Sequence, residues 1–149
     1  MIVIGSIVGI ASVFTVWFAG DLSIFNMQYT GWEMSGSPDA DYYKWMPLIV
    51  LVSSVAALAS GILSFFRKRE GGIIASLLGA VILLAVLAYV LYSSTLLYLP
   101  DMAVTAVSPM WLYEYAGIGI WLVIVAAILL IVGGSLLAVA EGKAERSAE

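Results

Sequence analysis

Few side chains in this sequence could do chemistry, and the most suggestive pair lies in one short segment. Asp39 and Asp41 follow the turn signal Gly36-Ser37-Pro38, and carboxylate oxygens are the ligands that Ca²⁺ prefers. A Ca²⁺ ion usually takes about 6–8 oxygen ligands, and two carboxylates supply too few of them. We therefore expect Asp39 and Asp41 to be solvated loop residues without a bound metal.

Other kinds of catalytic or cofactor site have no residues to build them. The chain contains no Cys and no His, which excludes thiolate or imidazole metal sites, disulfides, and Ser–His or Cys–His catalysis within it. Glu33 and Glu114 have no acid–base partner evident in the sequence. The net charge of −4 comes without any basic stripe, so no nucleic acid is expected as a partner. We assign no catalytic residue and no cofactor, and we expect a protein that is not an enzyme.

The composition is typical of a membrane protein. Hydrophobic residues make up 63% of the chain and charged residues 11%, against about 25% charged in a soluble domain. Four apolar segments without Lys, Arg, Asp or Glu come close to the roughly 20 residues that cross a bilayer. The sequence therefore predicts an all-α membrane fold, a single four-helix transmembrane bundle over residues 1–149. We expect helices at 2–19, 47–66, 73–92 and 117–140, outer loops at 20–46 and 93–116, a turn at 67–72 and a tail at 141–149.

The distribution of basic residues predicts the orientation of these helices. Five of the six lie in the turn and the tail, and only Lys44 lies in the first loop. Cytoplasmic loops carry the excess of Lys and Arg, so we expect a multi-pass protein of the cell membrane with both termini cytoplasmic. The first segment has no basic residue before it and no small-residue cleavage site at its end, which indicates an uncleaved anchor. Aromatic residues expected in an outer interfacial belt are Trp17, Trp45, Tyr92, Trp111, Tyr113 and Tyr115.

Small residues at four-residue spacing mark the faces on which the helices should pack, because lipid offers no hydrophobic force between helices. The predicted packing residues are Gly5, Gly9, Ser53, Ala57, Gly61, Gly72, Ser76, Ala80, Gly133 and Gly134. The simpler interpretation is that these stripes face one another inside one chain. The alternative is that one stripe, Gly5 with Gly9, pairs with a neighbouring subunit.

The first loop contains a strand pattern. Phe25, Met27 and Tyr29 alternate with polar residues, which predicts a β-strand with one apolar face in a small extracellular hairpin or sheet. Gly31 would permit a bend, after which Trp32 and Met34 would resume the apolar positions. We expect an interaction surface on the two outer loops, made by Tyr29, Gly31, Trp32, Glu33, Trp111 and Glu114.

The layout resembles the claudin superfamily along nearly the whole chain. Claudins carry a Gly-Leu-Trp motif in the first loop, and the segment 29–34, Tyr-Thr-Gly-Trp-Glu-Met, resembles it without the Leu. The segment 113–117, Tyr-Glu-Tyr-Ala-Gly, followed by Trp121 and Gly133-Gly134, is similar to the opening of the family's fourth helix. The family's loop disulfide is absent here. The resemblance implies adhesion, paracellular-type assembly or modulation of a partner.

Three functions fit these features. The first is a non-enzymatic tetraspan that acts by self-association, or by scaffolding or modulating a larger membrane protein, through its extracellular loops. The second is an accessory subunit of a larger membrane complex. The third is a small oligomeric channel or transporter, which the absence of ionisable residues from all four predicted helices disfavours. The partners predicted are the lipid bilayer and either further copies of the chain or a larger membrane protein.

Overall fold

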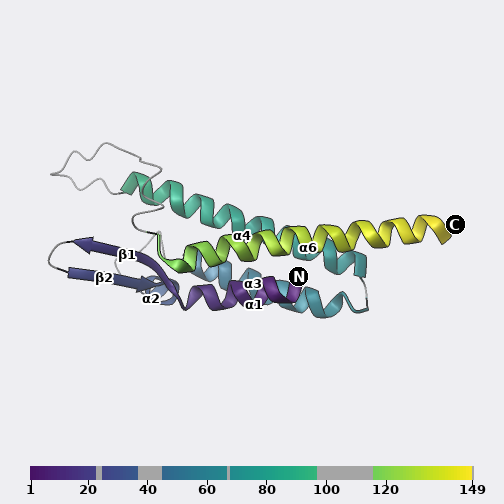
Figure 1. Ribbon diagram of the computed structural model, residues 1–149, viewed down its shortest axis with the longest axis horizontal. Helices are drawn as coiled ribbons and strands as arrows, with labels where there is room; N and C mark the ends of the chain where they lie inside the picture. Colours follow the sequence, from purple (N-terminus) through teal and green to yellow (C-terminus); the bar gives the residue numbers. More distant parts are fainter. Residues whose placement is uncertain (23–24, 37–44, 67, 97–115, 149) are drawn as a thin grey trace.

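The computed structural model describes residues 1–22, 25–36, 45–66, 68–96 and 116–148 as a bundle of helices with a β-hairpin at one end (Figure 1). Helix α1 (Ile2–Val13) packs on α3 (Trp45–Leu63) and α6 (Ile118–Ala148), and α4 (Lys68–Leu96) packs on the same two helices. The hairpin of β1 (Val16–Leu22) and β2 (Phe25–Thr30) follows α1, and the short helix α2 (Gly31–Gly36) follows the hairpin. We call the end of the bundle that carries the hairpin the hairpin end, and the opposite end, where α3 meets α4, the turn end.

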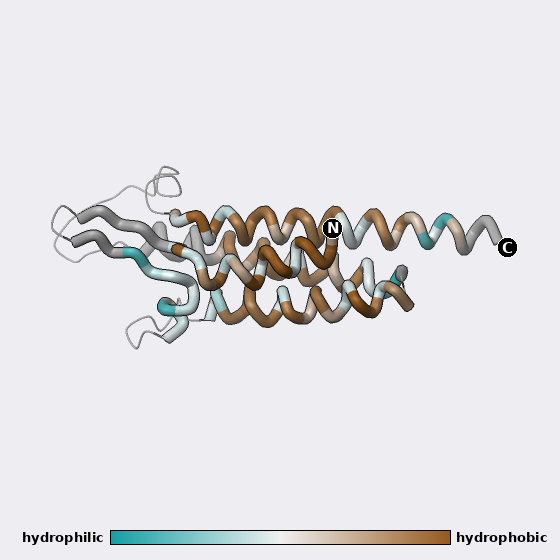
Figure 2. The backbone as a smooth tube through the Cα atoms, turned by 60° about the horizontal axis from the view of Figure 1, so that its bottom comes forward, coloured by the Kyte–Doolittle hydropathy of each residue, from teal (hydrophilic) through white to brown (hydrophobic). Residues whose placement is uncertain are grey.

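Three of the helices are long and apolar enough to cross a membrane, over Trp45–Leu63, Arg69–Ala88 and Ile118–Ala144. Only 39%, 33% and 33% of the residues in their most apolar windows are buried inside the protein, so much of each helix surface is exposed or half-exposed. The residues along these helices are mainly hydrophobic, as the tube coloured by hydropathy shows (Figure 2), and many of their large hydrophobic side chains are exposed. Apolar surface this extensive is normally covered by lipid or by another protein.

The first helix is shorter than predicted. We expected a helix over 2–19, but α1 ends at Val13 and its C-cap is Phe14. Residues 16–22 form the first strand of the hairpin instead. The β-branched and aromatic residues Thr15, Val16, Trp17 and Phe18 favour extended backbone, and a short apolar run does not distinguish helix from buried strand. The hairpin therefore draws one of its strands from the predicted first helix and the other from the loop.

The hairpin is antiparallel, and Ala19 pairs with Gln28, Gly20 with Met27 and Leu22 with Phe25. The predicted strand at 25–29 is present within β2, but the bend and continuing strand expected after Gly31 are not. Residues 31–36 form helix α2. Thr30 and Glu33 have the spacing of a capping box, in which two side chains close the first turn of a helix.

The bounds of the remaining helices also differ from those predicted. The helix expected at 47–66 is α3, which begins two residues earlier at Trp45 and ends at Leu63. The helix expected at 73–92 is α4, which begins at Lys68 and therefore includes most of the predicted turn. Helix α6 continues through the predicted tail to Ala148 and extends past the other helices at the turn end (Figure 1). Ala, Glu and Lys have high helix propensity, which explains a helical tail.

From Gly72 onward, the buried positions on α4 recur at alternating steps of three and four residues. They are Gly72, Ala75, Gly79, Ile82 and Val86. The predicted stripe of Gly72, Ser76 and Ala80, continued by Ala88, used steps of four only. Four residues turn a helix by about 400°, so such a series drifts by about 40° at each step, and Ala88 is indeed exposed. Alternating steps average 3.5 residues and stay on the face that packs against α6.

Candidate interaction site at the hairpin end

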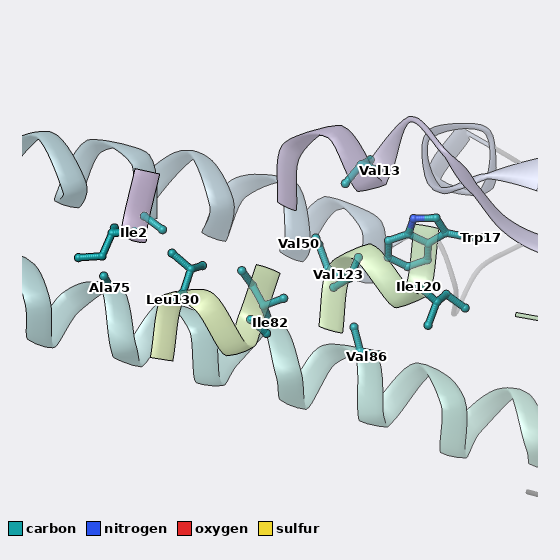
Figure 3. Packing of buried hydrophobic residues seen from close by; sticks show 12 residues of the cluster. Ile2, Val13, Trp17, Val50, Ala75, Ile82, Val86, Ile120, Val123 and Leu130 are labelled. Atoms are coloured by element: carbon teal, nitrogen blue, oxygen red, sulfur yellow. The ribbon is translucent and has the colours of Figure 1, made fainter. Parts of the chain in front are cut away.

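One buried tryptophan joins the hairpin to the helices. Trp17, the second residue of β1, is 1% exposed and lies with Val13 and Ile120 in the apolar core (Figure 3). Its indole Nε1 donates a hydrogen bond of 2.8 Å to the carbonyl oxygen of Ser12, near the end of α1. Trp17 was predicted to belong to an exposed interfacial belt. That prediction is wrong, because its ring is enclosed by protein.

Two glycines make room for the Trp17 ring. A Cβ atom on Gly31 would lie 2.8 Å from Trp17 Cε2 and 2.9 Å from the carbonyl oxygen of Val13. A Cβ atom on Gly119 would collide with Trp17 Cδ1 and lie 2.7 Å from Thr15 Oγ1. Both glycines are needed for space, since the backbones of α2 and α6 come directly against the indole. We call Trp17 with Gly31 and Gly119 the tryptophan clamp.

Backbone hydrogen bonds hold the same junction together. The amide of Gly117 donates to the carbonyl oxygen of Trp17 at 2.9 Å, which ties the segment before α6 to β1. The amide of Gly31 donates to the carbonyl oxygen of Thr15 at 3.4 Å. The junction therefore joins the end of α1, both strands through their shared base, the start of α2 and the start of α6.

The outer face of the junction presents exposed aromatic residues. The rings of Trp32 and Phe14 stack with centroids 5.8 Å apart at 31°. Trp32 is 51% exposed, Phe14 54% and Tyr29 44%. Of the predicted interaction surface, Trp32 and Tyr29 are thus accessible, while Gly31 lies buried beneath Trp17. Trp32 lies on α2 rather than on a strand.

Glu33 has a structural function in this site. Its Oε2 accepts hydrogen bonds from the Thr30 amide at 2.8 Å and from Thr30 Oγ1 at 2.9 Å, and the Glu33 amide donates to Thr30 Oγ1 at 3.2 Å. This is a complete capping box for α2. The hydrogen bonds from the Thr30 backbone and hydroxyl stabilise the carboxylate and lower the pKa of Glu33 below its ordinary value of 4.5. Glu33 is exposed, yet its carboxylate is already engaged.

Some predicted residues lie outside the described part of the chain. They are Asp39, Asp41, Trp111 and Glu114. Within the residues that the structure describes, no group of three or more Asp or Glu side chains is placed to hold a metal ion. The site residue that sequence reasoning missed is Trp17 as a buried clamp. The sequence signal for it was the run of β-branched and aromatic residues at 13–18, which favours a strand but was assigned to the first helix.

Comparison with known proteins identified no relative of this chain. No family model, no curated protein and no solved structure matches the chain. The resemblance to claudins therefore stays a prediction from sequence, and the function has to be argued from the chain's own residues and their geometry.

The predicted packing glycines lie between helices of this chain. A Cβ atom on Gly5 would lie 3.0 Å from Leu129 Cβ of α6, and one on Gly9 would collide with Ser54 Oγ of α3. The face of α1 that carries Gly5 and Gly9 is thus covered by α3 and α6. This arrangement leaves that face unavailable to a neighbouring subunit.

The stripes on α3, α4 and α6 are also covered from within. On α3, Ser53, Ala57 and Gly61 are buried. A Cβ atom on Gly72 of α4 would lie 2.7 Å from the carbonyl oxygen of Gly134, and one on Gly133 would lie 2.7 Å from Met1 Cβ. Ala80 of α4 is half-buried, whereas its neighbour Gly79 is buried against Leu130 and is the closer contact.

Apart from the Trp17 indole, the buried polar side chains among the described residues are serines, and several serine hydroxyls bond to backbone carbonyls close in the sequence. Those that donate to a carbonyl three or four residues earlier are Ser6, Ser12, Ser60 and Ser64. Ser76 differs, because its Oγ donates to the Ile131 carbonyl of α6 and lies 2.9 Å from Ser135 Oγ. The Ser54 hydroxyl is buried without a hydrogen-bond partner among the described residues. None of these groups forms a nucleophile–base pair.

Proposed function

We propose that this chain is a tetraspan membrane protein in which α3, α4 and α6 each cross the bilayer, and α1, only 12 residues long, lies beside α3 and α6 as a fourth, shorter membrane segment. The observation that supports it is the exposed apolar surface along the long helices, of which Leu77, Leu84 and Val52 are each more than 60% exposed. The hairpin end faces outside and the turn end faces the cytoplasm, since five of the six basic residues belong to the turn and the tail.

Two single-cysteine variants test this topology, because the chain has no Cys of its own. An impermeant maleimide applied to intact cells should label Ser37→Cys and leave Ser147→Cys unlabelled until the membrane is permeabilised. Labelling of Ser147→Cys alone on intact cells would reverse the orientation. Release of the protein from membranes by alkaline carbonate would refute the membrane assignment itself.

The proposed activity is non-enzymatic: the protein acts by contact at its hairpin end, either with another copy or with a larger membrane protein. The tryptophan clamp is the observation that carries this proposal. An isolated two-stranded hairpin is marginal in water, and this one is fastened at its base to the ends of three helices. A hairpin held in one orientation is suited to presenting a surface, because little ordering entropy remains to be lost on binding.

Site-specific photocrosslinking tests the contact. A photoreactive amino acid at Tyr29, exposed on β2, should give a discrete crosslinked product in native membranes. The same amino acid at Leu84, exposed on the side of α4, is the matched control and should give diffuse lipid adducts. A product of twice the monomer mass would identify self-association, and a larger defined product would identify a scaffolded partner or a complex in which this chain is an accessory subunit. No product at Tyr29 would contradict the proposal.

Trp32→Ala provides a second test at the same surface. It removes exposed aromatic area without touching the capping box, so it should weaken the Tyr29 crosslink while leaving α2 folded. Glu33→Ala is a less specific probe, because it deletes the cap of α2.

The channel alternative makes a different prediction. In the described residues the buried polar groups are serines, and an ion crossing the bilayer needs polar groups at depth to replace its water. Purified protein in liposomes should show no cation flux above that of empty vesicles. Saturable flux that is abolished by neutralising Glu33, Asp39 and Asp41 would refute the contact proposal and establish a channel.

A further inference from the structure

Exposed aromatic side chains gather at the hairpin end of the bundle, and the proposed contact at Tyr29 leaves most of them without a function. Phe14 follows α1, Trp32 lies on α2, Trp45 begins α3, and Trp121 lies in the first turn of α6. Their exposed fractions are 54%, 51%, 60% and 39%. We call these four residues the aromatic band.

Contacts between α1 and α6 place three of these residues at nearly the same height along the bundle. Gly5 lies against Leu129, and the two helices run in opposite directions (Figure 1). Phe14, nine residues after Gly5, is therefore level with residue 120, nine residues before Leu129 and next to Trp121. Trp32 shares this height, because its ring stacks on Phe14 with centroids 5.8 Å apart.

The start of α3 lies close to the same height. Gly9 of α1 lies against Ser54 of α3, and these helices also run in opposite directions, so Phe14 is level with about residue 49. Trp45 is four residues further toward the hairpin end, about 6 Å by the helical rise. The aromatic band therefore spans little more than one helical turn along the bundle axis.

The aromatic band lies about one bilayer thickness from the other ends of the apolar helices. Trp121 is 20 residues before Glu141, the first charged residue of α6, a distance of about 30 Å by the helical rise. Trp45 is 18 residues before Leu63, the last residue of α3, a distance of about 27 Å. The hydrocarbon core of a bilayer is about 30 Å thick, so a bilayer that covers the apolar faces of these helices ends at the aromatic band.

The exposed side of α2 suits the boundary between lipid and water. The exposed residues of this helix are Trp32, Glu33 and Gly36. The Glu33 carboxylate already accepts hydrogen bonds from Thr30, so the Trp32 ring is the large side chain that this surface offers to its surroundings. Trp joins an apolar ring to an N–H donor and is enriched at membrane interfaces, where one end of the side chain meets lipid and the other meets polar groups.

We propose that α2 rests on the outer surface of the bilayer, with the stacked rings of Trp32 and Phe14 in the headgroup layer of the outer leaflet. Helix α2 directly follows β2, so this lipid contact supports the second strand of the hairpin, as the tryptophan clamp supports the first. Trp32 then affects the contact at Tyr29 by positioning the hairpin above the membrane. This inference rests on the membrane arrangement proposed above, with the hairpin end outside.

Spin labels on single cysteines measure where α2 lies, because the chain has no Cys of its own. The full chain is reconstituted at low density in phosphatidylcholine vesicles. Each label is tested for collisions with oxygen, which concentrates in lipid, and with a water-soluble nickel complex present on both sides of the membrane.

Gly36→Cys is the test position. A Cβ atom there meets no described atom within 4 Å, and Gly36 shares a face of α2 with Trp32, four residues earlier. Leu84→Cys, exposed on the side of α4, gives the value for lipid, and Gln28→Cys, exposed on β2, gives the value for water. The ratio of oxygen to nickel collisions at position 36 should lie between these two values.

Two substitutions of Trp32, each combined with Gly36→Cys, test whether its ring holds α2 at the membrane. Trp32→Ala should lower the ratio at position 36 to the value at position 28, because the ring that favours the interface is lost. Trp32→Tyr should keep the ratio near its original value, since Tyr is also enriched at membrane interfaces. The ratio at position 84 should be the same with either substitution, because α4 crosses the bilayer independently of α2.

Four results would overturn the proposal. Equal ratios at positions 36 and 28 with Trp32 present would show that α2 stands in water, whatever the Trp32 variants do. Shielding of position 36 from both oxygen and nickel would show that a second copy of the chain covers α2. An unchanged ratio in Trp32→Ala would exclude the ring as the anchor. A ratio at position 84 as low as that at position 28 would refute the membrane arrangement itself, while the Tyr29 crosslink reports separately on the contact between proteins.

Discussion

Replacing the clamp residue Trp17 is the most direct test of how the hairpin is held. In Trp17→Ala the indole leaves a space bordered by Val13, Ile120 and two glycines, Gly31 and Gly119, which have no side chains to move into it. Loss of a fully buried Trp typically costs about 3–5 kcal/mol of unfolding free energy. We expect the upper half of that range, because the glycine borders cannot collapse without moving helix backbone.

Trp17→Phe divides this cost into its parts. The phenyl ring keeps much of the packing but loses the indole donor to the Ser12 carbonyl. That carbonyl retains hydrogen bonds from Thr15 Oγ1 at 2.7 Å and from the Thr15 amide at 3.2 Å, so it is not left unpaired. The lost hydrogen bond should then contribute only about 0.5–1.5 kcal/mol. Adding the smaller ring's lost contacts, we expect about 1–3 kcal/mol in total.

Equilibrium unfolding in detergent micelles, followed by circular dichroism, measures these differences. Limited proteolysis of the segment 16–30 should rise in parallel in Trp17→Ala, because the hairpin loses its fastening. The control is Trp32→Ala, whose half-exposed ring stacks on Phe14 and should cost less than about 1.5 kcal/mol. A Trp17→Ala protein within about 1 kcal/mol of wild type, or one no less stable than Trp32→Ala, would refute the clamp.

Three further predictions concern single hydroxyl and carboxyl groups. Ser76→Leu should lower the melting temperature in detergent and cost about 1–3 kcal/mol, because it overpacks the contact with Ile131 and removes a hydrogen bond between helices; an unchanged melting temperature would contradict that contact. Ser54→Ala should leave the unfolding free energy unchanged or raise it, since it removes a buried hydroxyl without a described partner; a loss above about 1 kcal/mol would reveal one. The lowered pKa of Glu33 means that its carboxylate stabilises α2 fully above pH 4.5 and loses this effect as the pH falls through the lower folded-state pKa. An NMR titration should place the Glu33 midpoint below 4.5, and Thr30→Val should raise it toward the ordinary value.

The three long helices could be predicted from the sequence because each apolar run contains no charge. Pro47 and the basic turn at 67–69 marked two of their boundaries closely. The bounds at the other ends differ, since hydropathy shows where a helix is apolar and does not show where helical hydrogen bonding stops. Helix α6 illustrates this, because it continues through polar residues of high helix propensity to Ala148.

The first helix could not be placed correctly from hydropathy. A short apolar segment is compatible both with a helix in lipid and with a buried strand. In the structure, the helix ends and the strand begins within residues 13–18. By contrast, α2 could have been predicted, because Thr30 and Glu33 have the capping-box spacing. The two residues between them, Gly31 and Trp32, were instead interpreted as a bend and a return to the apolar positions of a strand.

Only part of the candidate site could be predicted from the sequence. Exposure of Tyr29 and Trp32 follows from their place in a loop, whereas the buried position of Trp17 depends on contacts from α2 and α6, far along the chain. An aromatic residue at the end of an apolar run fits an interfacial belt and a buried anchor equally well. Only the two glycines brought against it by the fold distinguish these cases.

Helix α6 contacts the hairpin at one end of α1 and the chain's first residue at the other. Its Gly119 lies against Trp17 at the hairpin end, and its Gly133 lies against Met1. These glycines are 14 residues apart, about 21 Å along a straight helix. Between them, Gly79 of α4 lies against α6, where a Cβ atom would be 2.9 Å from the Ala127 carbonyl oxygen, and just beyond Gly133 a Cβ atom on Gly72 would be 2.7 Å from the Gly134 carbonyl oxygen. Because Gly119 of the same helix lies against the Trp17 ring, the close packing of α6 on α4 also helps to fix the position of the hairpin's base.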